Sequence, residues 1–230
     1  MRLDRYISQT TGLSRKDAKL AIRRGRVSIN GTVVTTPEHS VGADCEVTLD
    51  DQTLRAPAAR YFMLHKPPGV VCSTSDPQNP TVLGLLDEPR IEELHPVGRL
   101  DIDTTGLVLL TDDGQWSHAI TSPKRHQPKT YYAELAEPLL PELIEKFKKG
   151  MMLHGEDKRT LPAELEIIGE KAARVTITEG RYHQVKRMFA AQGNHVVRLH
   201  REAIGAVRLD PELQPGDYRA LTDEEVESLR

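Results

Sequence analysis

Cysteine, aromatic residues and long apolar runs are all scarce in this chain of 230 residues. The two cysteines, Cys45 and Cys72, stand apart without CxxC spacing, which argues against a disulfide framework or a thiolate zinc site. No run of about 18 apolar residues exists, so no transmembrane helix is predicted. The first residues, MRLDRYISQTTG, lack the apolar core of a signal peptide, and we therefore expect a cytoplasmic protein with no membrane partner.

Metal-binding patterns are also missing, although the chain contains nine histidines. His195 and His200 are five residues apart on a predicted strand, and no HExxH motif occurs. We therefore expect neither a metal nor a cofactor.

The charge is distributed unevenly along the chain. Residues 1–30 contain eight Arg and Lys residues against two Asp, whereas the whole chain has a net charge of −3. A basic segment joined to an acidic remainder indicates that this segment contacts a polyanion.

The basic segment has the pattern of a small folded module covering residues 1–50. Ser14 is placed to cap a helix that runs to about Arg24, and Asn30-Gly31 between β-type residues predicts a hairpin. The stretch GADCEVTLD predicts a further strand. A basic helix face is expected from Arg15, Lys16, Lys19, Arg23, Arg24 and Arg26, the last only if the helix continues past Gly25.

Residues 51–60, DQTLRAPAAR, are predicted to be a linker, because they show no periodicity and contain an Ala-Pro and a Pro-Ala step. Residues 61–230 then alternate strand-like runs, such as GLVLLT and KTYYAEL, with helical segments such as YHQVKRMFAAQG. The sequence predicts an α+β protein whose second domain is a mainly antiparallel mixed sheet with flanking helices.

The first 50 residues resemble the S4-type RNA-binding module through RLDRYI, SRKDAKLAIRRGRVSING and VGADCEVTL. The resemblance implies that the basic side chains contact RNA, where five or six cations would neutralise several phosphates. A solvated basic helix without a partner is the alternative.

Four segments of the remainder resemble pseudouridine synthases of the RsuA group, in the order expected for that family. They are YFMLHKPPGVVCST, HPVGRLDIDTTGLVLLTDDG, KTYYAEL and EGRYHQVKRMF. The resemblance spans nearly the whole chain and implies an S4-like head joined to a pseudouridine synthase body. It further implies that the substrate is a uridine of 16S rRNA, at position 516, in naked RNA or a partly assembled small ribosomal subunit.

The resemblance makes Asp101 the catalytic residue. Pseudouridine is an isomer of uridine: the N1–C1′ bond breaks, the base rotates, and C5 bonds to C1′, so no cofactor is required. An ionised carboxylate can attack the sugar or the base, or remove a sugar proton. Burial would favour the protonated carboxyl, so a fixed cation is expected nearby; motif position implies Lys186, with Arg187 as the alternative.

Two further site residues are implied by position. Tyr131 matches an active-site tyrosine whose ring stacks on the target uracil and whose hydroxyl helps to remove the C5 proton, although a strand tyrosine is more often a core residue. Arg99 matches a residue that enters the RNA in place of the extruded base. Asp103 is expected to stabilise the turn, and His183 to support the structure or contact RNA.

Two other functions remain open from the sequence. A non-catalytic factor for ribosome assembly would need the RNA-binding head and no ionised Asp101. A glycosidase-like hydrolase would use Asp101 with Glu93 or Asp103 and release free uracil. We expect the protein to be a monomer.

Overall fold

Helices α1 (Leu3–Thr11) and α2 (Arg15–Arg23) pack against each other at the start of the chain. Gly12, with φ of 73°, ends α1, and the Ser14 hydroxyl caps α2 by accepting a hydrogen bond from the Asp17 N–H at 3.1 Å. Helix α2 ends at Arg23, before Gly25, which has φ of 71°. The helix therefore does not extend to Arg26.

A four-stranded antiparallel sheet in the order β2-β1-β3-β4 completes this region. Its strands are β1 (Val27–Ile29), β2 (Thr32–Val33), β3 (Val47–Leu49) and β4 (Gln52–Leu54). The Asn30-Gly31 turn joins β1 to β2, as the hairpin prediction required. The strand predicted over GADCEVTLD is shorter than expected, and residue 43 of that stretch lies outside the described residues.

The interpretation of residues 51–60 as a linker is wrong in its first half. Asp50 and Asp51 both have positive φ and form a tight turn that pairs Leu49 with Gln52, so β4 belongs to the sheet. Asp and Asn tolerate this backbone region better than most residues, which explains how the chain turns here without glycine. Residues 56 and 57 of the predicted linker lie outside the described residues.

The computed structural model describes residues 1–42, 44–55 and 58–230. They form two units, Met1–Ala58 and Ala59–Arg230. Each unit has its own core; that of the first contains Leu3, Ile7 and Ile22, none of which is exposed.

The second unit contains a nine-stranded mixed sheet in the order β13-β5-β7-β11-β8-β10-β9, with β6 paired to β7 and β12 to β11. The strands are β5 (Tyr61–Lys66), β6 (His95–Val97), β7 (Thr105–Thr111), β8 (Lys129–Leu135), β9 (Glu164–Gly169), β10 (Ala172–Ile177), β11 (Val196–Ile204), β12 (Val207–Arg208) and β13 (Tyr218–Ala220). Only the β7–β11 pairing is parallel among the described strands.

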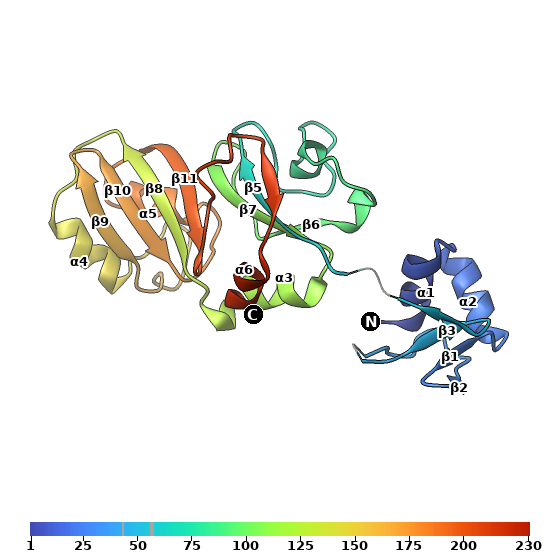
Figure 1. Ribbon diagram of the computed structural model, residues 1–230. Helices are drawn as coiled ribbons and strands as arrows, with labels where there is room; N and C mark the ends of the chain where they lie inside the picture. The colour runs from blue at the N-terminus through green and yellow to red at the C-terminus, as the bar shows by residue number, and fades with distance from the viewer. Residues whose placement is uncertain (43, 56–57) are drawn as a thin grey trace. The chain divides into compact units, whose positions relative to one another are not determined.

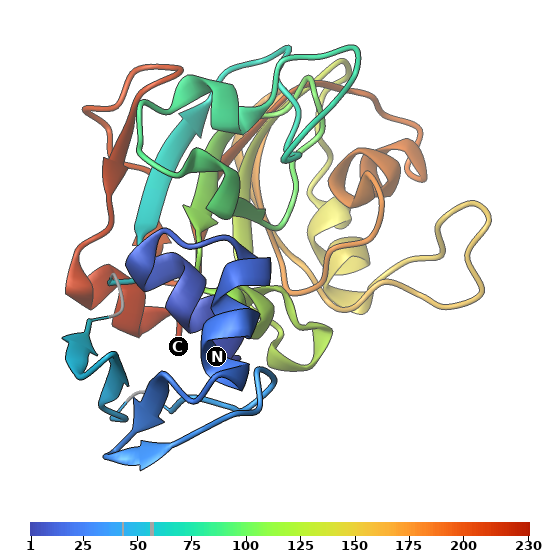
Figure 2. The same ribbon diagram turned by 90° about the vertical axis from the view of Figure 1, so that its right-hand side faces the viewer.

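Helices cover the sheet in two groups. In Figure 1, α4 (Glu142–Lys149) and α5 (Gln184–Ala190) lie against the part formed by β9, β10, β8 and β11. Helices α3 (Gly114–Thr121) and α6 (Asp223–Ser228) adjoin each other, and the Trp116 indole donates to the Val226 carbonyl at 3.0 Å. Short 3₁₀ turns lie at Val82–Leu85, Ile91–Glu93 and Pro123–Arg125. In the turned view, a long loop between α4 and β9 projects from the sheet (Figure 2).

The predicted α+β fold is therefore confirmed.

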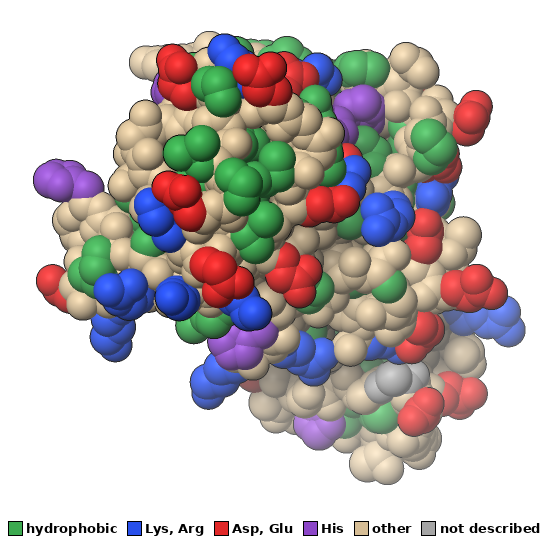
Figure 3. Space-filling view, turned by 90° about the vertical axis from the view of Figure 1, so that its left-hand side faces the viewer, with side chains coloured by type: hydrophobic (Ala, Val, Ile, Leu, Met, Phe, Trp, Pro, Cys, Tyr) green, Lys and Arg blue, Asp and Glu red, His purple; other side chains and the backbone are tan. Residues whose placement is uncertain are grey.

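Exposed apolar side chains lie at the α4–β9 end of the sheet. They are Leu140, Ile144 and Ile168, and Figure 3 shows hydrophobic side chains there interrupted by acidic and basic ones. Such mixing is ordinary for a solvated surface. Among the described residues, no helix combines the length and apolar composition that crossing a bilayer requires.

Candidate active site

The loop that carries Asp101 connects β6 to β7, and hydrogen bonds to its backbone carbonyls hold it in place. The Thr104 N–H donates to the Asp101 carbonyl at 3.1 Å, which closes a tight turn. The carbonyl of Ile102 accepts from the Gly69 N–H at 2.8 Å and from Lys66 Nζ at 3.2 Å. Lys66 is fully buried, and burial lowers its pKa. This lysine, which the sequence analysis did not single out, ties the Asp101 loop to strand β5.

Two basic side chains contact the Asp101 carboxylate. Lys186 Nζ lies 3.1 Å from Oδ2, and His183 Nε2 lies 3.2 Å from Oδ1. Both come from the start of α5, where His183 is the N-cap with φ of 48°. Lys186 also donates to Asp103 Oδ1 at 2.7 Å, so one ammonium bridges both carboxylates of the loop.

The bridging contacts of Lys186 shift the pKa values of both Lys186 and Asp103. Burial lowers the pKa of Lys186, but hydrogen bonds to Asp103 and Asp101 outweigh it, and the net shift is upward. The hydrogen bond from Lys186 holds the pKa of Asp103 below its usual range. Lys186 is therefore a permanent cation beside Asp101 at neutral pH.

Arg187, the alternative partner, points elsewhere. Its guanidinium pairs with Glu156 at 2.9 Å and donates to the carbonyls of Tyr182 and His154. Adjacent helical residues face different directions, as the sequence argument assumed. Among the two, only Lys186 contacts Asp101.

A cleft of about 810 Å³ opens above the Asp101 loop. Asp101, Asp103, Arg99, Tyr131 and Lys186 all line it, so residues separated by up to 87 positions in sequence meet at one site. Tyr131 is only 7% exposed, whereas Arg99 is exposed at the rim. Tyr132 is not among the cleft residues, consistent with the opposite orientation of its side chain on β8.

The cleft is more basic than the unit around it. Residues 59–230 contain 22 Lys and Arg against 27 Asp and Glu. The cleft instead has five cations, Arg99, Lys129, Arg181, Lys186 and Arg201, against three carboxylates, Asp101, Asp103 and Glu179. This excess of positive charge suits an anionic ligand.

Two of these cations, the buried Arg201 and the half-buried Lys129, were not expected from the sequence. Arg201 is 2% exposed, donates through Nε to the Leu107 carbonyl at 2.8 Å, and lies 6.0 Å from the Tyr131 ring centroid. Burial, together with the charge of Arg201, lowers the pKa of Lys129. The β11 motif LHREAIG contains Arg201, but nothing in its apolar spacing marks that side chain as a cleft residue.

Part of the predicted basic face of the first unit is already paired with carboxylates of the same unit. Arg15 and Lys19 lie 3.1 and 3.9 Å from the buried carboxylate of Asp4, and Arg26 pairs with Asp50. Lys16, Arg23 and Arg24 are exposed and form no ion pair within the described residues. Of the predicted basic face, these three side chains are free to meet a polyanion.

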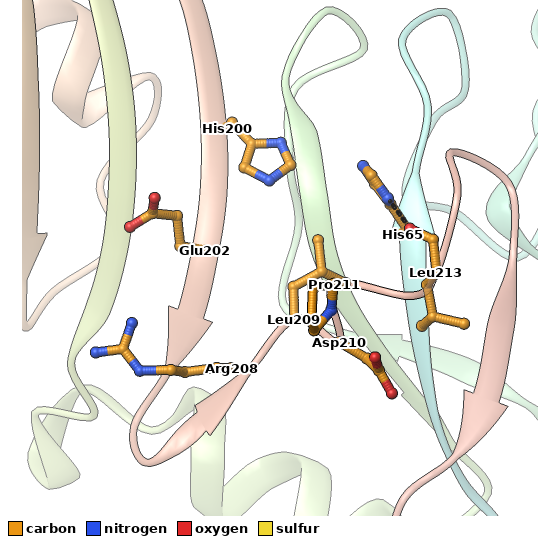
Figure 4. Close-up of a pocket in the computed structure, with 8 residues that line it drawn as sticks. All are labelled: His65, His200, Glu202, Arg208, Leu209, Asp210, Pro211 and Leu213. Atoms are coloured by element: carbon orange, nitrogen blue, oxygen red, sulfur yellow. Dashed lines mark hydrogen bonds between the residues drawn. The ribbon is translucent and has the colours of Figure 1, made fainter.

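A second, smaller cavity of about 320 Å³ contains none of the predicted site residues. Figure 4 shows His65 from β5 and His200 from β11 on its wall; their ring centroids are 5.4 Å apart. In the described part of the chain, His, Cys, Asp and Glu side chains form no group of three that could hold a metal. Glu93, the candidate second carboxylate of a hydrolase, pairs with Arg90 and does not line the larger cleft.

Comparison with known proteins identifies the family. Residues 60–191 match the RNA pseudouridylate synthase family, and residues 1–47 match the S4 domain. The chain therefore belongs to the RNA pseudouridylate synthase family and is an RNA pseudouridine synthase, an isomerase, with an S4 domain at its N-terminus.

Relatives match along the whole chain. The ribosomal small subunit pseudouridine synthase A of Escherichia coli K12 is 54% identical over 230 residues, covering 100% of both chains. That of Vibrio parahaemolyticus is 53% identical over 231 residues, covering 100% of this chain and 99% of the relative. A crystal structure of a pseudouridylate synthase superposes with a TM-score of 0.74 at 49% identity, covering 100% of each chain.

Proposed function

We propose that this enzyme converts one uridine of 16S rRNA in the small ribosomal subunit into pseudouridine, at position 516. The observation that carries the proposal is the full-length identity of 54% to a ribosomal small subunit pseudouridine synthase. The basic cleft around Asp101 supports it, because a flipped-out nucleotide brings phosphates as well as a base.

Asp101 is the catalytic residue in this proposal. Its side chain is 26% exposed, so it is reachable from the cleft, while Lys66 and Gly69 hold the backbone of the same loop at the Ile102 carbonyl. The carboxylate assists cleavage of the N1–C1′ bond, after which the base rotates and C5 bonds to C1′. The C5 proton is lost and N1 gains a proton, so substrate and product have the same atoms and no cofactor is consumed.

Lys186 places its ammonium 3.1 Å from that carboxylate, where it stabilises negative charge. His183 also lies against this carboxylate, with Nε2 3.2 Å from Oδ1. Tyr131 supplies an aromatic surface for the uracil, with its hydroxyl aiding removal of the C5 proton. The buried guanidinium of Arg201, 6.0 Å from the Tyr131 ring centroid, supports the position of the Tyr131 ring in the cleft.

Arg99 acts at the rim of the cleft, where its exposed side chain is proposed to fill the space that the extruded base leaves. The S4 domain supplies affinity through phosphate contacts from Lys16, Arg23 and Arg24, with smaller contributions from Arg15, Lys19 and Arg26, which already pair with carboxylates.

Mapping of pseudouridines tests the substrate directly. Ribosomal RNA from cells with and without this protein is compared at single-nucleotide resolution, and one small-subunit signal, at position 516, is expected to disappear with the protein. The wild-type gene should restore it and the Asp101→Ala gene should not. An unchanged pseudouridine map would rule the proposal out, and restoration by Asp101→Ala would leave a binding or assembly role in its place.

A further inference from the structure

Tyr182 is a large aromatic side chain left in solvent at the mouth of the cleft. It is 75% exposed, the highest exposure among the large hydrophobic residues described, and it belongs to the cleft lining. Burial therefore does not explain its position.

The ring is nevertheless held in place. It stacks on the imidazole of His183 with centroids 3.7 Å apart and planes at 19°. His183 in turn contacts Asp101 at 3.2 Å. One face of the Tyr182 ring is thus covered by a residue touching the candidate catalytic carboxylate, and the high exposure of the side chain leaves the other face open.

The backbone beneath the ring is rigidly anchored. Arg187 donates to the Tyr182 carbonyl at 3.0 Å. Arg181 donates to the carbonyls of Lys158 and Arg159, and it pairs with Glu179. Those carbonyls belong to the long loop between α4 and β9 visible in Figure 2. A turn tied down in this way presents the ring in one orientation and at low entropic cost to a ligand.

From these contacts we infer that the Tyr182–His183 stack is a platform for an unpaired nucleobase next to the target uridine. The inference rests on the proposed function, because it assigns a binding subsite for the same RNA. Every base has a π-face that stacks on an aromatic ring, and the surrounding cations suit the phosphates that accompany it. A platform beside Asp101 fixes the position of a neighbouring nucleotide and thereby aligns the flipped uridine.

The test measures RNA binding without turnover. An Asp101→Ala enzyme binds a short RNA hairpin that contains the uridine identified by mapping, and the same measurement is made after adding Tyr182→Ala, Tyr182→Phe or, as a control outside the cleft, Val197→Ala. We expect Tyr182→Ala to weaken binding about 5- to 100-fold. Tyr182→Phe should stay within about threefold, because it keeps the ring. Val197 is 64% exposed, and its replacement should have no effect.

A second variation locates the base. Hairpins carry an abasic nucleotide at each position flanking the uridine in turn. At one position the abasic change should weaken binding as much as Tyr182→Ala does, and combining the two should add nothing further. Equal binding by Tyr182→Ala and its parent would overturn the inference. So would a loss of binding energy from Tyr182→Ala that is additive with the loss from every abasic position, because the ring would then act only through His183 and not on a base.

The two hypotheses fail in different ways. If the wild-type enzyme isomerises no uridine of the hairpin or of small-subunit rRNA, the proposed function fails. If the wild-type enzyme isomerises the uridine while Tyr182→Ala leaves binding unchanged, only the platform fails.

Discussion

Gly106 lies directly opposite Arg201 across the parallel strands β7 and β11, with no room for a side chain between them. A Cβ on Gly106 would lie 2.3 Å from the Arg201 carbonyl oxygen, and Gly106 has φ of 107°. On its other edge Arg201 pairs with Tyr131 of β8. This cross-strand row sets the spacing between the Asp101 loop, which leads into β7, and the strand that carries Tyr131.

Gly106→Ala is therefore expected to destabilise the protein by about 2–4 kcal/mol, through backbone strain and the clash with Arg201. Urea denaturation measures the change. Gly114→Ala is the control, because Gly114 begins α3 with nothing within 4 Å of its Cβ position. Equal midpoints for the two variants would contradict the account of the row.

Lys186→Met should slow pseudouridine formation about 10- to 1000-fold, because the Asp101 carboxylate loses the cation that lies 3.1 Å from it. Single-turnover rates at neutral pH check this. Lys186→Arg, which keeps the charge, should recover much of the rate. Equal rates for the wild type and Lys186→Met would disprove the pairing.

The buried carboxylate of Asp4 should make the stability of the S4 domain depend on pH. Burial raises the pKa of its carboxyl, but hydrogen bonds from Arg2 and Arg15 outweigh that effect and lower it overall. A depressed folded-state pKa contributes stability above the unfolded value of about 4, and this stability is lost as the pH falls further. Protection of amides in residues 2–24 should decline in that acid range.

Asp4→Asn tests the same point at neutral pH. It should lower the local free energy of opening by about 1–3 kcal/mol, because the hydrogen bonds from Arg2 and Arg15 lose their charged acceptor. Hydrogen exchange in the full chain, corrected for intrinsic rates, measures it. Glu38→Gln is the control, since its exposed pair with Arg2 is worth about 0–1 kcal/mol. Similar protection in both variants would count against a structural role for Asp4.

The basic surface of the S4 domain predicts a change in salt dependence. Replacing Lys16, Arg23 and Arg24 with Ala should weaken RNA binding and flatten the plot of log affinity against log salt by about 2 units. The matched control removes Lys146, Lys148 and Lys149 from α4, which changes the net charge equally. Equal slopes for both triple variants would show that the charge acts without a local contact.

Much of this architecture was predictable from the chain because it depends on local signals. Gly12 and Ser14 mark the boundary between α1 and α2, and Asn30-Gly31 marks the first hairpin. The motif around Asp101 and the spacing of Lys186 and Arg187 on α5 narrowed the cation to two candidates. Contacts in space then separated them.

The rest could not be predicted because it depends on which distant segments meet. Asp50-Asp51 forms a turn without glycine, so β4 was taken for a linker. Lys66 is the last residue of strand β5, and it is buried in the fold, where its ammonium donates to the Ile102 carbonyl of the distant Asp101 loop. His183 contacts Asp101 because its left-handed backbone turns its ring toward that loop, and no spacing rule encodes that orientation.

Replacement of the candidate catalytic carboxylate separates catalysis from RNA binding. Asp101→Asn keeps the shape of the side chain and removes its charge, and it is compared with the wild type on 16S rRNA for both binding and pseudouridine formation. We expect Asp101→Asn to bind the RNA within a fewfold of wild type and to form no detectable pseudouridine. Pseudouridine formation at the wild-type rate by Asp101→Asn would show that the reaction does not need this carboxylate.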